Sequence, residues 1–303
     1  MHVILVDYGG VENASQAYTF LKNMFSDRRI LPAPFFIRPF VAKYIALKRQ
    51  NDLIENYKKI NFSPLKKTVK KIVENLNFRQ KNFTFSASFL YLPPYLTDLS
   101  GLLKEAVLFP LFPQFSTTTW GSIIDRVKKQ KDKKLVKPYY NHPDFLNLIE
   151  KRIKKTLEKI REEKTAIMFT AHSIPKYLEK KEPYVEQVKF QVNHFAEKLN
   201  IPVFLGFQSK LGPVKWVSPF IEETTEEIAK KGFENLIVFP LSFVIDNSET
   251  LYELDIYLKD FALEKGIKRF ERISLFNEDK DFSDFIVNYV KECVAEEKWL
   301  KLK

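Results

Sequence analysis

Two polar motifs of the chain follow short apolar runs, and each contains a side chain that can take up protons or ligate a metal. His172 follows the apolar run 166–169, and Glu249 lies shortly after the apolar run 236–241. Short continuous apolar runs are typical of buried parallel strands. Ligands of open α/β sheets bind at the carboxyl ends of such strands. We therefore expect this imidazole and this carboxylate to face one ligand.

The chemistry available to this pair is proton transfer, metal ligation or both. Imidazoles titrate close to neutral pH, so a neutral His172 can accept a proton or ligate iron. Glu253 lies four residues after Glu249, and a helix that begins at Glu249 would place both carboxylates on one face. Such a row of acidic oxygens predicts a path for metal or protons. The residues alone leave open that the histidine and Glu249 serve only the fold.

Composition restricts the class of protein. A length of 303 residues favours two domains. The only cysteine, Cys293, excludes a disulfide, a Cys-based zinc site and a Cys-ligated iron–sulfur cluster within one chain. The net charge of +11 comes from lysines interleaved with glutamates. This pattern is typical of solvated helix surfaces, and it lacks the basic stripe with stacking aromatics expected of a nucleic-acid-binding protein.

The first residues are typical of a strand, and no basic leader precedes them, so we expect no signal peptide. The apolar runs are far shorter than the ~20 residues that span a bilayer. We therefore expect a cytoplasmic protein whose only membrane contact is peripheral, at the inner membrane.

Strand and helix patterns alternate through both halves of the chain, which predicts an α/β fold with parallel sheets. We expect two Rossmann-like domains with the active-site cleft between them. The first comprises residues 1–130 together with a C-terminal helix at about 280–303, and the second comprises residues 131–279. The charged stretch 128–137 is predicted to be a loop that acts as the hinge.

Residues 31–48 combine aromatic residues with prolines and basic side chains, which is a composition more typical of a surface segment than of a core. The basic residues of this region are Arg38, Lys43, Lys48 and Arg49. One interpretation is a lip at the mouth of the site, which could also touch an anionic membrane surface. The other is an ordinary helix packed within its own domain.

Six motifs in order along the chain resemble those of the ferrochelatases, the class II, single-chain chelatases that insert ferrous iron into a porphyrin. They are Tyr8-Gly9-Gly10, Ser26-Asp27-Arg28-Arg29-Ile30, residues 111–116 with Thr119-Trp120-Gly121-Ser122, His172-Ser173-Ile174-Pro175, residues 208–213 with Trp216, and residues 249–255. Any one tetrapeptide is weak evidence, whereas six in the right order are specific.

The resemblance implies insertion of Fe(II) into a porphyrin, with protoporphyrin IX favoured, to form haem at the last stage of its biosynthesis. It implies catalytic and metal-binding roles for His172 and Glu249 and a relay role for Glu253. The substrate-binding residues that we infer are Tyr8, Trp216 and Phe243 against the ring and Lys48, Arg49, Ser63 and Ser116 at its propionates. We expect no prosthetic group, no iron–sulfur cluster, no nucleic-acid partner and a monomer.

Three alternatives remain open at this point: a coproporphyrin III ferrochelatase, a class II chelatase for another metal, and a non-enzymatic porphyrin or haem carrier. Two departures from the family pattern bear on them. Asn247 stands where the family usually has a histidine, and Tyr257 stands where it usually has a further glutamate. Since an amide neither takes up a proton at neutral pH nor binds iron well, we expect Asn247→Ala to cost little activity.

Overall fold

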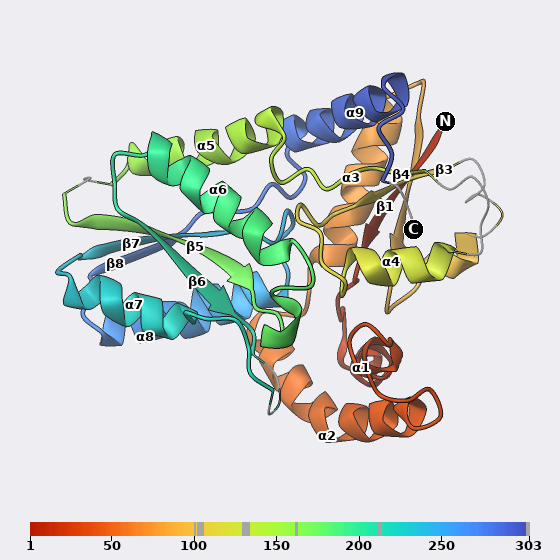
Figure 1. Cartoon of the computed structure of the whole chain (residues 1–303), viewed down its shortest axis with the longest axis horizontal. Coiled ribbons are helices and arrows are strands. Elements are labelled where there is room, and N and C mark those ends of the chain that lie inside the picture. Colours follow the sequence, from red (N-terminus) through yellow and green to blue (C-terminus); the bar gives the residue numbers. More distant parts are fainter. Residues whose placement is uncertain are drawn as a thin grey trace. The chain divides into compact units, whose positions relative to one another are not determined.

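The computed structural model of the protein describes residues 1–99, 101, 106–128, 134–160, 163–210, 212 and 214–300. The chain separates into two compact units. Unit 1 comprises Met1–Phe112, Ser116–Lys137 and Asn277–Lys303, and unit 2 comprises Pro113–Phe115 and Pro138–Phe276 (Figure 1). The C-terminal residues therefore belong to the same unit as the N-terminal ones.

Unit 1 contains a parallel four-stranded sheet in the order β2-β1-β3-β4. Its strands are β1 (His2–Asp7), β2 (Thr84–Phe89), β3 (Ala106–Pro110) and β4 (Lys134–Leu135). Its helices are η1 (Ala14–Gln16), α1 (Ala17–Ser26), α2 (Arg38–Lys59), α3 (Leu65–Arg79), η2 (Leu96–Leu99), α4 (Trp120–Val127) and α9 (Lys280–Ala295). In the register of the sheet, Val3 of β1 lies between Phe85 and Val107.

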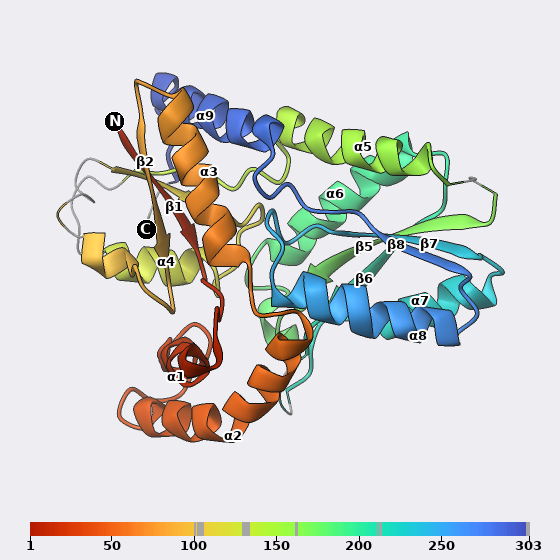
Figure 2. The ribbon, with the colours of Figure 1, turned by 180° about the vertical axis from the view of Figure 1, so that it is seen from behind.

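Unit 2 repeats this plan with the order β6-β5-β7-β8 (Figure 2). Its strands are β5 (Thr165–His172), β6 (Val203–Gln208), β7 (Asn235–Pro240) and β8 (Arg269–Arg272). Its helices are α5 (Pro143–Leu157), η3 (Lys176–Leu178), α6 (Tyr184–Lys198), α7 (Ile221–Lys230), the π-helix η4 (Glu249–Leu258) and α8 (Lys259–Glu264). Two parallel four-stranded sheets with flanking helices confirm the predicted α/β class.

The predicted hinge loop at 128–137 is wrong in part, because Lys134 and Leu135 form β4 and pair with β3. Residues 129–133 of that stretch lie outside the described residues. The strand β8 has no counterpart in the sequence prediction either. It is a four-residue strand with three charged side chains, so it lacks the apolar run that revealed the central strands.

Both faces of the unit 2 sheet are covered, which explains the continuous apolar runs in its central strands. On one face, Ala166 and Met168 of β5 belong to a buried cluster with Ile228 of α7 and Leu254 of the π-helix. On the other face, the ring of Phe169 stacks on that of Phe195 of α6, with 5.2 Å between centroids. Successive side chains of a strand point to opposite faces, so the run 166–169 of β5 is apolar at every position.

The order of the strands fixes where each unit can bind a ligand. After β5 the chain moves to β6 on one side, then crosses back to β7 on the other side. The strand order therefore reverses between β5 and β7, and the carboxyl ends of these two strands form the topological switch point where open α/β sheets bind ligands. The same argument selects the ends of β1 and β3 in unit 1.

The region 31–48 becomes helical at Arg38, where the 22-residue helix α2 begins. Pro39 lies in the first turn, where its missing N–H would have no helical partner. The guanidinium of Arg38 donates to the carbonyls of Leu31 (3.1 Å) and Ala33 (2.6 Å), which ties the proline-rich loop to the helix. Within the described ranges, no helix combines the length and the apolar character that crossing a bilayer would require.

Candidate active site

His172 ends β5 and is held there by a closed set of hydrogen bonds. Its backbone N–H donates to the Ser242 hydroxyl (3.0 Å), and its carbonyl accepts from the Tyr184 hydroxyl (2.9 Å). The two hydroxyls are 2.6 Å apart. Since the Tyr184 proton goes to the carbonyl, the Ser242 proton goes to Tyr184. The backbone of His172 is thereby fixed by residues from α6 and from the loop after β7.

The surroundings of the His172 ring define its tautomer. Nδ1 lies 2.5 Å from the Ser173 carbonyl, which can only accept a hydrogen bond. Nδ1 therefore carries the proton, and the neutral ring leaves a lone pair on Nε2. Nε2 lies 3.8 Å from Oε2 of Glu249, and 38% of the His172 side chain is exposed. The structure thus brings together the imidazole and the carboxylate selected from the sequence.

Glu249 begins the π-helix, and Asn247 caps it. The side-chain oxygen of Asn247 accepts from the backbone N–H groups of Glu249 (2.8 Å) and Thr250 (3.3 Å). The backbone N–H of Asn247 donates in return to the Thr250 hydroxyl (3.0 Å). Because the first N–H groups of a helix lack helical partners, this amide satisfies two of them. Asn247 therefore fixes the start of the helix that carries both glutamates.

The carboxylates of Glu249 and Glu253 both contact one hydroxyl, that of Ser209. The Ser209 Oγ lies 3.0 Å from Oε2 of Glu249 and 2.6 Å from Oε2 of Glu253. A hydroxyl has one proton to donate, so one of these two contacts requires a protonated carboxyl. Burial and the negative charge of Glu249 raise the pKa of Glu253 to about 7. Glu253 is therefore the carboxyl that carries a proton close to neutral pH.

The two aromatic residues predicted in unit 2 lie next to this strand end. Trp216 forms an antiparallel bridge with Pro175, and the next residue, Val217, donates from its N–H to the Ile174 carbonyl (3.0 Å). Phe243 directly follows Ser242 and is half-buried. Leu211 and Pro213 of the predicted 208–213 motif lie outside the described residues.

In unit 1, Tyr8 follows β1 and is fixed by its neighbours. Its hydroxyl donates to the Thr118 carbonyl (3.0 Å), and its ring packs on those of Tyr91 and Phe112. Gly10, two residues on, lies against Ser63, where an added Cβ would come within 2.2 Å of the Ser63 Oγ. The glycine therefore lets the turn after β1 approach Ser63.

The remaining predicted residues of unit 1 lie in different surroundings. Ser116 is buried, and its hydroxyl is 2.9 Å from that of Thr118. Lys48 and Arg49 are exposed on α2. The structure thus groups His172, Glu249 and Glu253 with two aromatic residues in unit 2, and it groups Tyr8, Ser63 and Ser116 around strand ends of unit 1.

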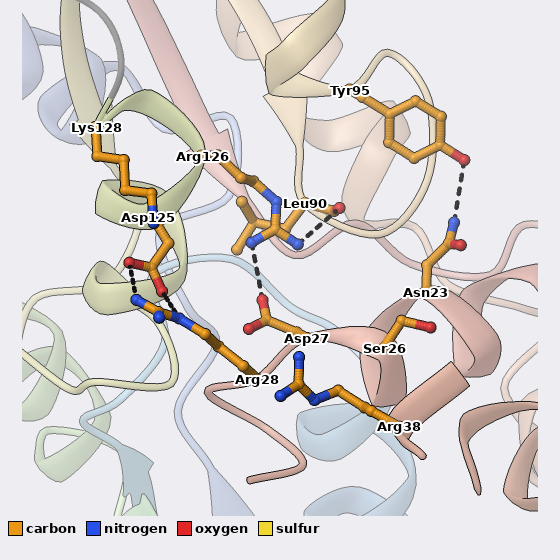
Figure 3. A pocket seen from close by; sticks show the side chains of 10 residues that line it. All are labelled: Asn23, Ser26, Asp27, Arg28, Arg38, Leu90, Tyr95, Asp125, Arg126 and Lys128. Atoms are coloured by element: carbon orange, nitrogen blue, oxygen red, sulfur yellow. Dashed lines mark hydrogen bonds and ion pairs between the residues drawn. The ribbon is translucent and has the colours of Figure 1, made fainter. Parts of the chain in front are cut away.

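Residues 26–28 of the motif 26–30 line a pocket of about 620 Å³ in unit 1 (Figure 3). The charged side chains of the motif pair with residues of α4. Arg126 donates to Asp27 (2.8 Å) and Arg28 donates to Asp125 (2.7 Å). Arg29 also donates to Asp125 (2.9 Å). These pairs connect the residues after α1 to α4, so the structure gives this motif a role in joining two elements of unit 1.

Tyr184 and Ser242 were missed by the sequence interpretation. They fix His172 from positions 12 and 70 residues away. No local pattern marks a tyrosine on a helix or a serine in a loop as a partner of a distant strand. The cap formed by Asn247 did leave a signal, because asparagine is a preferred residue at helix N-termini.

Comparison with known proteins shows the family. The ferrochelatase family model matches residues 2–294. The chain belongs to the ferrochelatase family. The ferrochelatase of Aquifex aeolicus is 33% identical over 96% of this chain and 99% of its own length, and that of Geotalea uraniireducens is 31% identical over 97% and 98%. A ferrochelatase-family chain is a metal chelatase and thus a lyase.

Solved structures support the fold. SirB from Bacillus subtilis with Fe3+ matches 98% of this chain and 96% of its own, at a TM-score of 0.58 and 11% identity. CbiX, described as the terminal enzyme for siroheme biosynthesis in denitrifying bacteria, matches 96% and 99% at a TM-score of 0.55 and 13% identity. At this identity the ferrochelatase-family chain shares a chelatase fold with both proteins.

Proposed function

We propose that the chain inserts Fe(II) into a porphyrin, with protoporphyrin IX as the favoured substrate, and so forms haem. Family membership supports the reaction. The observation that supports its location is the 3.8 Å approach of His172 Nε2 to Glu249 Oε2 at the switch point of the unit 2 sheet. A free lone pair and a carboxylate at one strand end meet the two needs of the reaction, which are proton removal and guidance of a cation.

Insertion exchanges two pyrrole protons for one divalent cation, with no change in the oxidation state of iron. His172 accepts the first proton at Nε2 while its Nδ1–H remains on the Ser173 carbonyl. The resulting imidazolium lies next to the Glu249 carboxylate, which stabilises the positive charge. A positioned base of this kind typically contributes ~10²–10⁴-fold to the rate.

The second proton leaves through the glutamates in this proposal. Glu249 faces His172 and accepts from Ser209, and Ser209 contacts Glu253. When Glu253 has lost its proton, as its pKa of about 7 allows near neutral pH, Glu249 takes the pyrrole proton and donates it to Ser209, and Ser209 donates its own proton to Glu253. This shift of two protons moves one proton from Glu249 to Glu253 without any large movement of the side chains. The same hard oxygens suit an incoming Fe(II) that sheds its water.

The proposed ring contacts follow the chemistry of the porphyrin, which is apolar at its centre and anionic at its propionates. Trp216 and Phe243, beside the strand end that carries His172, offer aromatic faces to the macrocycle. The ring contact of Tyr8 stays a prediction, as do the propionate contacts of Lys48, Arg49, Ser63 and Ser116. A pocket that prefers a bent ring over a flat one would favour the transition state over the substrate.

The test is an anaerobic steady-state assay with Fe(II) and each of two porphyrins, protoporphyrin IX and coproporphyrin III, followed by absorbance. We expect conversion of both, with the higher kcat/KM for protoporphyrin. A higher value for coproporphyrin would reassign the substrate. Tight porphyrin binding without conversion would instead indicate a carrier.

We also propose that α2 and the loop before it contact an anionic membrane surface. Phe35, Phe40 and Tyr44 expose 80%, 75% and 62% of their surfaces. Phe40, Tyr44 and Leu47 lie at helical spacing on one face of α2, while Ala42 and Ala46 are its buried residues here. An exposed aromatic face next to Lys43 and Lys48 suits the boundary between lipid tails and anionic headgroups.

A further inference from the structure

Arg272 ends β8 and forms a forked ion pair with the π-helix. Its Nε and Nη2 donate to the two carboxylate oxygens of Asp255 (2.5 and 2.7 Å), and its Nη1 donates to Oδ1 of Asp246 (2.8 Å). Only 7% of the Arg272 side chain is exposed. A largely buried guanidinium that engages two carboxylates in this way defines both their distance and their orientation.

Along the sequence, one partner of Arg272 precedes Glu249 and the other follows Glu253. Asp246 belongs to the loop that precedes the π-helix, and Asp255 lies within it. Asp246 also accepts from the Thr250 hydroxyl (3.1 Å). Thr250 in turn is part of the Asn247 cap, which holds the N–H of Glu249. One side chain of β8 is thus connected through hydrogen bonds to the backbone of Glu249.

The π-helix needs such a restraint. Its i→i+5 hydrogen bonds are rarely continued beyond one turn, yet here ten residues adopt this form. Leu254 and Leu258 bury its inner face, but apolar packing has no preferred direction and tolerates rotation about the helix axis. A bidentate ion pair does not tolerate it, because both N–H···O bonds would be lost together.

We propose that Arg272 is a positioning residue for iron insertion, which holds the π-helix in the rotation that directs Glu249 and Glu253 toward Ser209 and His172. This inference rests on the proposed function, because it assigns Arg272 an effect on the rate of iron insertion. Arg272 itself acts through Asp246 and Asp255. It lies outside the six sequence motifs, whereas both of its partners lie within or next to the motif at 249–255.

The test compares R272M and R272K with R269M, a control on the same strand whose arginine side chain is 45% exposed. We expect kcat for iron insertion to fall ~10–100-fold in R272M, which is typical for loss of a residue that orients a ligating group. R272K, which keeps the charge but lacks the fork, should lie in between. Porphyrin Kd and the activity of R269M should stay within about twofold of wild type.

The split between kcat and KM separates positioning from a purely structural role. Loss of positioning should lower kcat per folded molecule while the KM for porphyrin stays close to that of wild type, with the active fraction measured by porphyrin titration. A purely structural role would lower the thermal stability and the active fraction while kcat per folded molecule stayed unchanged. If R272M does not fold, R272K and D255N, which leaves Arg272 paired with Asp246, supply the same comparison.

The result that overturns the proposal is a wild-type kcat per folded molecule in both R272K and D255N. A parallel assay of the wild-type protein shows whether the role of Arg272 or the proposed function itself is wrong. A wild-type protein that binds porphyrin but inserts no iron would contradict the proposed function and, with it, the role of Arg272. An active wild type with unaffected variants would contradict the role of Arg272 alone.

Discussion

At the scale of single residues, the site depends on which nitrogen of His172 carries the proton. The Ser173 carbonyl binds Nδ1–H and directs the Nε2 lone pair outward. Neither the tautomer nor the hydroxyls that hold the strand end are visible in the sequence, because the partners are backbone groups or distant residues. The histidine and Glu249 themselves could be predicted, since each follows an apolar run that forms a central strand.

Asn247 should matter for stability more than for chemistry. We expect Asn247→Ala to lower the free energy of unfolding by about 1 kcal/mol, because two helix N–H groups lose their acceptor. Asn247→Ser should retain most of the stability, since serine is also a good cap. Urea denaturation measures both values, and equal stability of the alanine variant and the wild type would contradict the cap.

The activity of the same variants tests the earlier expectation that an amide here takes no part in proton transfer. Asn247→Ala should reduce kcat/KM far less than Glu249→Ala does under the same conditions. Comparable losses would show that the amide contacts the substrate or the metal, and the assignment of Asn247 as a cap alone would then be wrong.

Among the helices and strands, the π-helix is the element at which the structure differs most from the sequence prediction. A helix beginning near Glu249 with two glutamates on one face could be expected from their spacing. The π form could not, because it depends on β8, the Asn247 cap and the buried leucines, and no local pattern separates it from an α-helix. The edge strands β4 and β8 were missed for a related reason: they are short and carry charged residues, so tertiary pairing alone defines them.

The buried carboxyl of Glu253 predicts a pH dependence of stability. Its pKa is about 7 in the folded protein, above the ~4.3 of an unfolded glutamate. A raised carboxyl pKa means that the folded state binds the proton more tightly, so this group favours folding at low pH and loses that contribution as the pH rises from about 4 through 7. Glu253→Gln removes the titration. We expect wild type to lose stability relative to this variant between pH 5 and pH 8.

Urea titrations of both proteins at several pH values measure this difference. Glu264→Gln is a suitable control, because Glu264 is an exposed carboxylate at the C-terminal end of α8. A constant difference between wild type and Glu253→Gln across this pH range would contradict the protonation assigned to Glu253 and the direction of the Ser209 hydrogen bonds.

At the scale of the whole molecule, the exposed face of α2 predicts salt-sensitive, peripheral binding to anionic vesicles. Flotation with phosphatidylglycerol liposomes should recover the protein at low salt and release it at high salt, because surface charges are screened. Charge reversal at Lys43 and Lys48 should weaken recovery. The same reversal at Lys67 and Lys70, exposed on α3, should not. Arg38 is a poorer site for this test than its charge suggested, since it holds the loop before α2.

Two outcomes would contradict membrane contact by α2. One is the absence of binding at low salt, and the other is binding that high salt leaves unchanged. Equal effects of the α2 and α3 charge reversals would show that net charge, rather than this face, attracts the protein to the vesicles.

The proposed reaction requires His172 to accept a porphyrin proton during iron insertion. The most direct measurement compares wild type with His172→Ala in an anaerobic single-turnover assay, in which porphyrin-loaded protein is mixed with Fe(II) and metalloporphyrin absorbance is followed. His142→Ala, which changes a histidine that caps α5, serves as the control. We predict that His172→Ala binds porphyrin with a Kd close to that of wild type and inserts iron ~10²–10⁴-fold more slowly. Insertion within a few-fold of the wild-type rate would contradict the account.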